Sequence, residues 1–360
     1  MKKILYLKIA LFLYLLISNT AIVSQELGDF KPKEDTFGLN KLKNKSKKIY
    51  ISNFSVNFQL YNEKQKKNSG GSLFRDKGVR GDATAELMVG LGNVNENNFQ
   101  TITNTLYDDF ITKLTANGFE IITADVAGKT ETYEGWTKAS GPIIITPPDK
   151  PGLISATPAG FDFYYLEKTK VGKLISEKLA GLDKTPQNLS KDMDDAVVVA
   201  VDLYVFFMKD AYAFQGTAAN IKIKTQLSLV ANEAISAKSN DKSLFFRKKV
   251  EYVTGANSIS FVCGKYKIGG SAESVYTGVL KKDFTIENVI DKKVIQSYTK
   301  SDVDFIGTDT YFGKLYEADN KTSSKTTVIP VDPKKYNEGI IKAGNVFLEH
   351  HLNAFTAEFK

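Results

Sequence analysis

The residues best suited to chemistry in this chain of 360 residues are one cysteine and two histidines. Cys263 would be a nucleophile only as a thiolate beside a base such as His350 or His351. It lies in the apolar run 260–264, where a free cysteine usually packs as a small hydrophobic residue. The adjacent histidines point to different sides of a helix and lack the HExxH zinc spacing. We therefore expect His351 to pack in the core and His350 to be solvated.

Carboxylates offer a second kind of site. Asp192, Asp194 and Asp195 could bind calcium, but the spacing of an EF-hand loop is absent, and a solvated acidic turn at the end of a sheet is favoured. Asp202 is more informative because it stands alone in the apolar run 196–208. A buried carboxylate needs a partner or a shifted pKa, whereas a carboxylate at a sheet edge can face water.

Aromatic residues surround Asp202 and complete the candidate site. They could line a ligand site or face lipid, but lipid-facing strands alternate apolar and polar residues, and this run does not. A core strand covered on both faces is favoured. The predicted binding residues are Asp202, Tyr204, Phe206, Tyr212 and Phe214. No Walker loop or Gly-x-Ser-x-Gly elbow is present, so we predict a protein that is not an enzyme, with no catalytic residue, no metal site and no cofactor.

The N-terminus has the pattern of an export signal. Lys2 and Lys3 precede the apolar run 9–17, which is too short for a transmembrane helix. We predict a signal peptide over 1–24 and no transmembrane helix after its cleavage. Because Cys263 lies far from the cleavage point, no cysteine is placed to carry a lipid.

Composition limits the classes of partner. The formal charge is +7, three of the lysines lie in the predicted signal, and arginine occurs only at 75, 80 and 247. Proteins that bind nucleic acids usually depend on arginine, so we predict no nucleic-acid partner. One cysteine forbids an internal disulfide, and with 42% apolar residues the chain can fill a large core.

The apolar pattern after the signal predicts a single domain over 47–360. Residues 25–46 are polar and predict a flexible leader. Residues 48–60 alternate as a strand, with a bulge near Asn53 where the alternation changes phase. Two irregular insertions are predicted, near 61–97 and 126–161; the second holds five of the nine prolines, all within 136–160.

Helical spacing is clearest over 99–114, where Asn97 or Asn98 caps the start and Asn117–Gly118 ends the helix. A strand over 119–122 follows, which predicts a parallel strand pair with a right-handed crossover. A second helix is predicted over 166–179, ending at Gly181 and excluded beyond Pro186. The last helix begins at Asp332, with Pro333 in its first turn.

The strand pattern completes the fold prediction. Residues 196–208 predict a central strand, and the runs 221–230, 244–253 and 259–268 predict antiparallel hairpins or a meander. One or two further strands are expected within 275–294. The predicted fold class is α/β, a mixed sheet with an early amphipathic helix, an antiparallel meander and a C-terminal helix packed on the sheet.

Three segments resemble an envelope-protein superfamily that includes the curli-assembly CsgG-type lipoproteins and the amino-terminal domain of the TolB type. The segments are 114–122, with Asn-Gly-Phe leading into a strand; 194–199, an acidic lead into a central strand; and 227–231. The third departs from the family because no Asp-Gly turn follows it, and 232–241 reads as a polar loop. The missing lipid-anchor cysteine departs from the CsgG-type members and puts anchoring and a pore role in doubt.

The signal and the resemblance together imply an exported protein of the periplasm or the outer-membrane periphery. The predicted function is non-enzymatic binding or assembly, as an accessory to another envelope protein or polymer, and a homo-oligomer is compatible with it. The alternative is a secreted or surface ligand-binding module that uses the loops 61–97 and 136–160. A hydrolase would need Asp202 beside a second carboxylate.

Overall fold

The computed structural model describes residues 26–43, 45–68, 83–166, 184–210, 221–240, 249–297, 307–310, 313–316 and 327–359. The predicted signal peptide, Tyr212, Phe214 and all but the first residue of the helix predicted over 166–179 lie outside the described residues.

A mixed sheet of eleven strands forms the centre of the fold. Its main path runs β1 (Pro32–Phe37), β15 (Ala272–Leu280), β14 (Ser258–Lys265), β10 (Val197–Asp210), β2 (Lys48–Gln59), β8 (Leu153–Thr157) and β7 (Ile143–Ile145). β5 (Glu120–Ile122) pairs with β2, while β11 (Ile221–Leu229) pairs with β10, β16 (Phe284–Ile286) and β17 (Val294–Ser297). The predicted α/β fold class is confirmed.

The central pair is β10 and β2, which run parallel, while β14 flanks β10 in the antiparallel sense. The β2–β10 register shifts where Val199 and Ala200 face Ile51 and Asn53, so Ser52 is an extra residue. The bulge predicted near Asn53 is therefore confirmed. It explains the change of phase in the sequence, because a bulge moves the following side chains to the other face.

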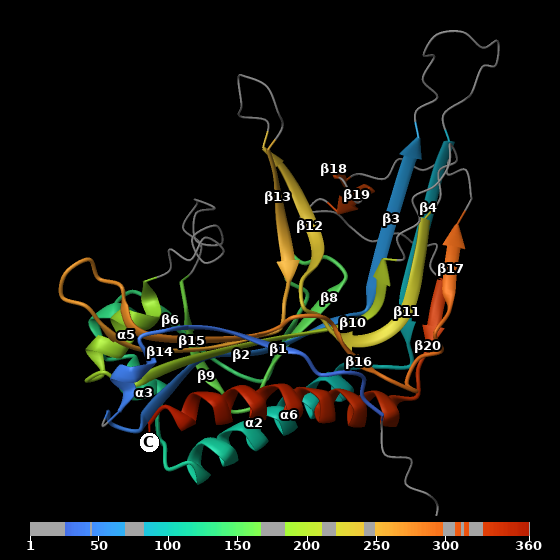
Figure 1. Cartoon of the computed structure of the whole chain (residues 1–360). Helices are drawn as coiled ribbons and strands as arrows, with labels where there is room; N and C mark the ends of the chain where they lie inside the picture. The colour runs from blue at the N-terminus through green and yellow to red at the C-terminus, as the bar shows by residue number, and fades with distance from the viewer. Residues whose placement is uncertain are drawn as a thin grey trace, which may run out of the picture.

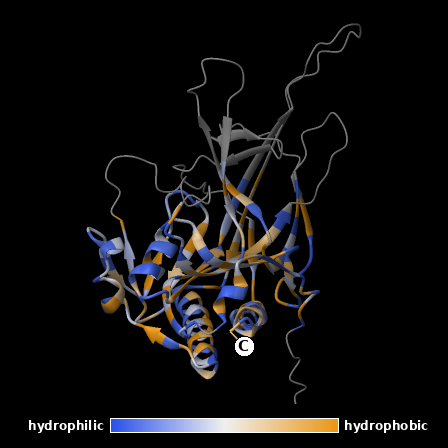
Figure 2. Cartoon of the chain, turned by 60° about the vertical axis from the view of Figure 1, so that its left-hand side comes forward, coloured by the Kyte–Doolittle hydropathy of each residue, from blue (hydrophilic) through white to orange (hydrophobic). Residues whose placement is uncertain are grey.

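Two long helices, α2 (Glu96–Ala116) and α6 (Pro333–Ala357), cover one face of this sheet (Figure 1). α2 begins at Asn95 with a capping box rather than at Asn97 or Asn98, and Asp332 caps α6 as predicted by accepting two backbone hydrogen bonds. Figure 2 shows hydrophobic and hydrophilic residues on the same helices, as amphipathic packing requires. The two helices bury the aromatic core of the domain against the sheet, including Phe99, Phe110, Phe347 and Phe355.

The predicted strand, helix and strand are confirmed as a parallel unit. β5 pairs with the start of β2 in the parallel sense, through Glu120 to Ile122. Gly118 ends the intervening helix with φ +83°, a left-handed conformation that favours glycine.

The prediction of a flexible leader over 25–46 is wrong for its described part. β1 pairs with six residues of β15 in the antiparallel sense, and the 3₁₀ helix η1 (Leu39–Leu42) buries Leu42 completely. β1 is an edge strand whose side chains are mostly exposed. It therefore needs no apolar alternation, because its order comes from backbone hydrogen bonds to its partner.

The prediction of an irregular insertion over 61–97 is also wrong for its described residues, 61–68 and 83–97. β3 (Tyr61–Asn68) and β4 (Ala83–Gly92) form a hairpin in a second, seven-stranded sheet. The polar loop expected over 232–241 is largely β12 (Glu233–Asn240), which pairs with β13 (Lys249–Gly255). β18 (Gly307–Thr310), β19 (Gly313–Tyr316) and β20 (Thr327–Pro330) complete this sheet. Both hairpins rise from the side of the main sheet that faces away from α2 and α6 (Figure 1).

The insertion predicted over 126–161 is partly ordered into short elements between its prolines. These are α3 (Ala124–Ala127), the 3₁₀ helix η2 (Glu131–Tyr133), β6 (Thr137–Ser140), which pairs with β9 (Asp162–Tyr165), and the strands β7 and β8. The prediction is wrong for β7 and β8, because both extend the main sheet.

Pro186 also differs from its prediction. It lies in the first turn of α5 (Thr185–Asp192), where the missing N–H of proline costs no helical hydrogen bond, so proline starts this helix and does not exclude one.

The runs predicted over 221–230, 244–253 and 259–268 overlap with β11, β13 and β14, and each of these strands has an antiparallel partner, in β10, β12 and β15 respectively. Among the described residues the three strands do not pair with one another, so the meander predicted from these runs is not formed. Within the described residues, no helix combines the length and the apolar character needed to cross a membrane.

Candidate functional site

A line of polar side chains crosses the face of the main sheet opposite α2 and α6. The bulge at Ser52 creates it, because Phe54, Val56 and Phe58 of β2 now face the helices and the intervening residues face the other way. We call this line and its neighbours the polar row: Asn53, Ser55, Asn57 and Gln59 of β2, Asp202 and Tyr204 of β10, Ser155 of β8, and Lys150.

Asp202 lies opposite Ser55 in the β2–β10 register. Its Oδ1 accepts hydrogen bonds from Asn53 Nδ2 at 2.9 Å and from Ser55 Oγ at 2.8 Å. Oδ2 has no hydrogen-bond partner among the described residues, and the side chain is half-buried. The lone carboxylate of the apolar strand is thus stabilised on one oxygen by neutral donors, while its other oxygen can accept from a ligand.

Asn57 is completely buried beside this pair. Its amide donates to the Leu203 carbonyl at 3.0 Å, and its Oδ1 accepts from Ser155 Oγ at 2.9 Å. Gln59, the next residue on the same face, has a buried Oε1 without a hydrogen-bond partner. The row therefore combines a fixed amide and hydroxyl network with an unsatisfied acceptor at its end.

Lys150 adds a positive charge. Its Nζ donates to Tyr204 Oη at 2.7 Å and lies 5.0 Å from the centre of the tyrosine ring. Burial disfavours the charged lysine, but Tyr204 and the carboxylates of Asp202 and Asp149 outweigh burial and raise the pKa of Lys150. Burial raises the pKa of Tyr204, and Lys150 opposes that shift. Because its pKa is raised, Lys150 contributes an ammonium group to the row at neutral pH.

The structure places the predicted binding residues unequally. Asp202 and Tyr204 lie in the polar row, but Tyr204 is itself buried and belongs with Phe206 to a core cluster that also contains Leu153, Val230 and Ile235. Sequence reasoning missed the β2 residues of the row, although the polar positions after the phase change at Asn53 carry their signal.

Cys263 packs in the core, as the apolar run 260–264 predicts. It is almost completely buried, its Sγ lies 3.2 Å from the Asp195 carbonyl oxygen, and burial raises its pKa to about 11. The thiol therefore stays protonated near neutral pH, and a protonated thiol is a poor nucleophile.

The structure also shows the contacts of the acidic turn, 192–195, and of the two histidines. Asp192 accepts hydrogen bonds from the backbone and the hydroxyl of Thr132, and Asp195 pairs with Lys45 at 2.6 Å. These contacts favour an acidic turn that closes the end of the sheet rather than a calcium-binding loop. His351 is completely buried, as expected, whereas His350 is half-exposed and pairs with Glu34.

Comparison with protein-family models, with curated proteins and with solved structures finds no match for this chain. The function must therefore be inferred from the fold and from the polar row.

Proposed function

We propose that the chain is an exported, non-enzymatic protein that binds another component of the cell envelope, a protein or a polymer, through the polar row. The observation that carries the proposal is that an acceptor, Asp202 Oδ2, and a charged donor, Lys150, lie on the same face of the main sheet, close enough for the carboxylate to raise the pKa of the lysine. The export pattern of the first 24 residues and the resemblance to the CsgG and TolB superfamily support the envelope location.

The spacing of the row favours an extended partner. Alternate residues of a strand repeat about every 6.7 Å. Asn53 and Ser55 lie one such step apart on β2, and the half-buried groups that a partner could reach are Asn53, Asp202 and Ser155. Asn57 is buried beneath them and holds Ser155 in place. A polar chain or an extended peptide segment could meet several of these groups at once, which a small ligand could not.

The described side chains that hydrogen-bond Asp202 do not include the second acid that the hydrolase alternative needs. A carboxylate pair requires a second acid converging on the same reacting atom. The side chains that hydrogen-bond Asp202 are an amide, Asn53, and a hydroxyl, Ser55. These groups position a carboxylate for binding and supply no second general acid.

The second candidate function is a secreted or surface ligand-binding module. One observation favours it: Lys150 and Ser155, both from the proline-rich segment 136–160, contribute to the polar row. Both candidates therefore use the same surface, and they differ in where the protein works.

Fractionation of cells that make the chain natively tests the location. The proposal predicts that the protein sediments with the envelope or is released by osmotic shock, and that protease digests it only after the outer membrane is opened. A cytosolic protein and a periplasmic protein are followed as controls. Recovery in the culture medium, or cleavage on intact cells, would support the second candidate, and recovery with the cytosolic control would contradict both.

A further inference from the structure

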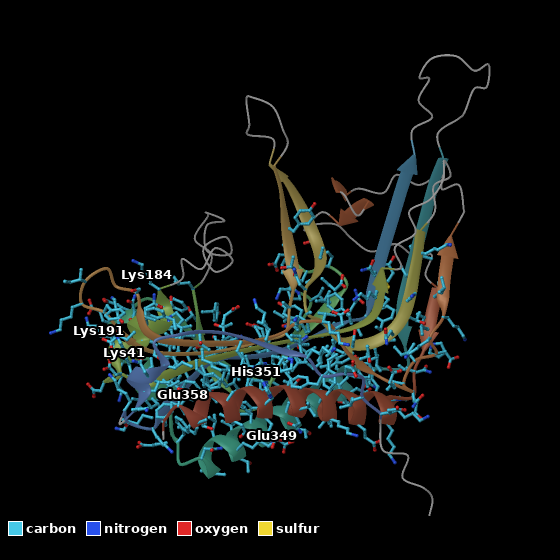
Figure 3. All side chains as sticks on the ribbon, in the orientation of Figure 1. Lys41, Lys184, Lys191, Glu349, His351 and Glu358 are labelled. Carbon is cyan, nitrogen blue, oxygen red and sulfur yellow. The ribbon has the colours of Figure 1, made fainter. Side chains whose placement is uncertain are left out.

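A second cluster of polar side chains lies on the opposite, helix-covered face of the main sheet. Glu34 of β1 and the adjacent His350 and His351 of α6 each bring one potential ligand atom within 4.8 Å of the others. His350 Nε2 is already 3.1 Å from Glu34 Oε1. The adjacent histidines were expected to point to different sides of the helix, but their ring centres are 5.0 Å apart. Figure 3 places His351 on the sheet side of α6 and Glu349 on its outer side. The cluster therefore joins the first strand of the fold to its last helix.

His351 is held in one orientation. Its Nδ1 lies 2.8 Å from the hydroxyl of Tyr276. Nε2 is buried and has no hydrogen-bond partner of normal geometry among the described residues, although the backbone of Val279 lies near the ring. An unpaired nitrogen in a buried site is costly. The cost would be relieved by a group that accepts the lone pair of Nε2, and a metal ion is such a group.

The surroundings are apolar and close-packed. The ring of Phe347 lies 4.7 Å from that of His351, and Phe30 lies 5.3 Å from His350, measured between ring centres. Gly278 of β15 lies directly under the His351 ring, because a Cβ there would come within 2.3 Å of Nδ1. Apolar walls around polar ligands limit the access of water, as at many metal sites.

We propose that Glu34, His350 and His351 bind one divalent transition-metal ion, with Zn²⁺ as the ion of choice, and that Nε2 of His351 is its buried ligand. Two imidazoles and one carboxylate form a familiar zinc ligand set, and a water molecule completes the tetrahedron. Tyr276 acts as a positioning residue that orients the His351 ring. The site goes beyond the proposed function, since it lies on the other face of the sheet from the polar row.

The three ligand atoms must move closer together to bind one ion, because they now lie within 4.8 Å of one another. Ligand atoms around a tetrahedral zinc ion lie about 3.3 Å apart, given bonds of about 2.0 Å. Glu34 and His350 are both more than one-third exposed, so their side chains can rotate toward the buried His351. Once bound, the ion would tie together residues separated by 316 positions in sequence and would stabilise the folded chain.

Isothermal titration of the metal-free protein with ZnCl₂ tests the site, using a purification tag that contains no histidine. We expect one zinc ion per chain and a higher melting temperature with zinc. Glu34→Gln and His350→Ala should each weaken binding at least about tenfold, and Tyr276→Phe about tenfold. Glu349→Gln, on the outer side of α6, should bind as the original chain does. His350 and His351 are the only histidines, so no other pair can replace them.

Two outcomes would overturn the proposal. One is an original chain that binds no stoichiometric zinc and whose melting temperature does not respond to it. The other is binding by Glu34→Gln and His350→Ala at the original affinity. Circular dichroism shows whether each variant is folded, and Co²⁺ gives a second measurement, because its visible absorption bands should appear with the original chain and be lost in both variants.

Discussion

Replacing Gly278 by valine is expected to lower the free energy of unfolding by about 3 kcal/mol, because the new side chain overlaps a buried ring. Gly278 lies on β15 beneath His351, and a Cβ there would lie 2.3 Å from Nδ1 and 2.4 Å from Cγ of the imidazole. The ring is fully buried against Phe347, so it cannot move aside without lifting α6 from the sheet. The loss should appear as an earlier unfolding midpoint in urea.

Thr277→Val provides the matched control. Thr277 is the preceding residue of β15 and points to the other face, where it is half-buried. A β-branched residue is already present there, so the change should alter stability by less than about 1 kcal/mol. Equal urea unfolding midpoints for the two variants would contradict the close packing of the His351 ring of α6 against Gly278.

Asn257→Ala is expected to cost about 2–3 kcal/mol, because it removes a fully buried amide that completes the hydrogen bonding of β10. β10 pairs with β14 as far as Asp202 and with β11 from Val205 onward. Tyr204 falls in the gap between the two partners. Asn257 fills the gap, since its Oδ1 accepts from Tyr204 N at 3.0 Å and its Nδ2 donates to Tyr204 O at 2.9 Å.

The same amide also donates to Val230 O at 2.8 Å, so it joins the end of β11 to the start of β14. Alanine leaves the Tyr204 N–H buried without its partner. Asn345→Ala is the control, because Asn345 donates to Asp109 between α2 and α6 at a half-buried position, and its loss should cost no more than about 1 kcal/mol. Urea unfolding of both variants checks the difference, and a cost for Asn257→Ala no larger than for Asn345→Ala would contradict this role.

The sequence predicts well those elements whose own apolar pattern shows which side chains are buried. α2 and α6 carry apolar stripes and end signals, and β10 is apolar on both faces because it lies at the centre of the sheet. Even the bulge at Ser52 is visible as a change of phase in the alternation of β2.

The elements that the sequence did not predict depend on partners far away in the chain. β1 is polar and pairs with β15, about 240 residues later, and β12 pairs with β19, about 80 residues later, as well as with the neighbouring strand β13. The candidate sites share this limit. Asp202 stands out within its own strand, but its hydrogen-bond partners lie on β2. Glu34 lies in a polar segment with no apolar alternation, so the sequence gives no reason to place it beside His350.

Site-specific photo-crosslinking from the polar row tests the proposed binding surface most directly. A photoreactive amino acid at Ser155, which is half-buried at the edge of the row, is activated in living cells that make the chain. The control position is Glu349, exposed on the outer side of α6 (Figure 3). We expect a discrete adduct with one envelope component from position 155 alone, and at least a severalfold loss of that adduct when Asp202→Ala is combined with it. Adducts of equal yield from both positions, or none from position 155, would contradict binding through the polar row.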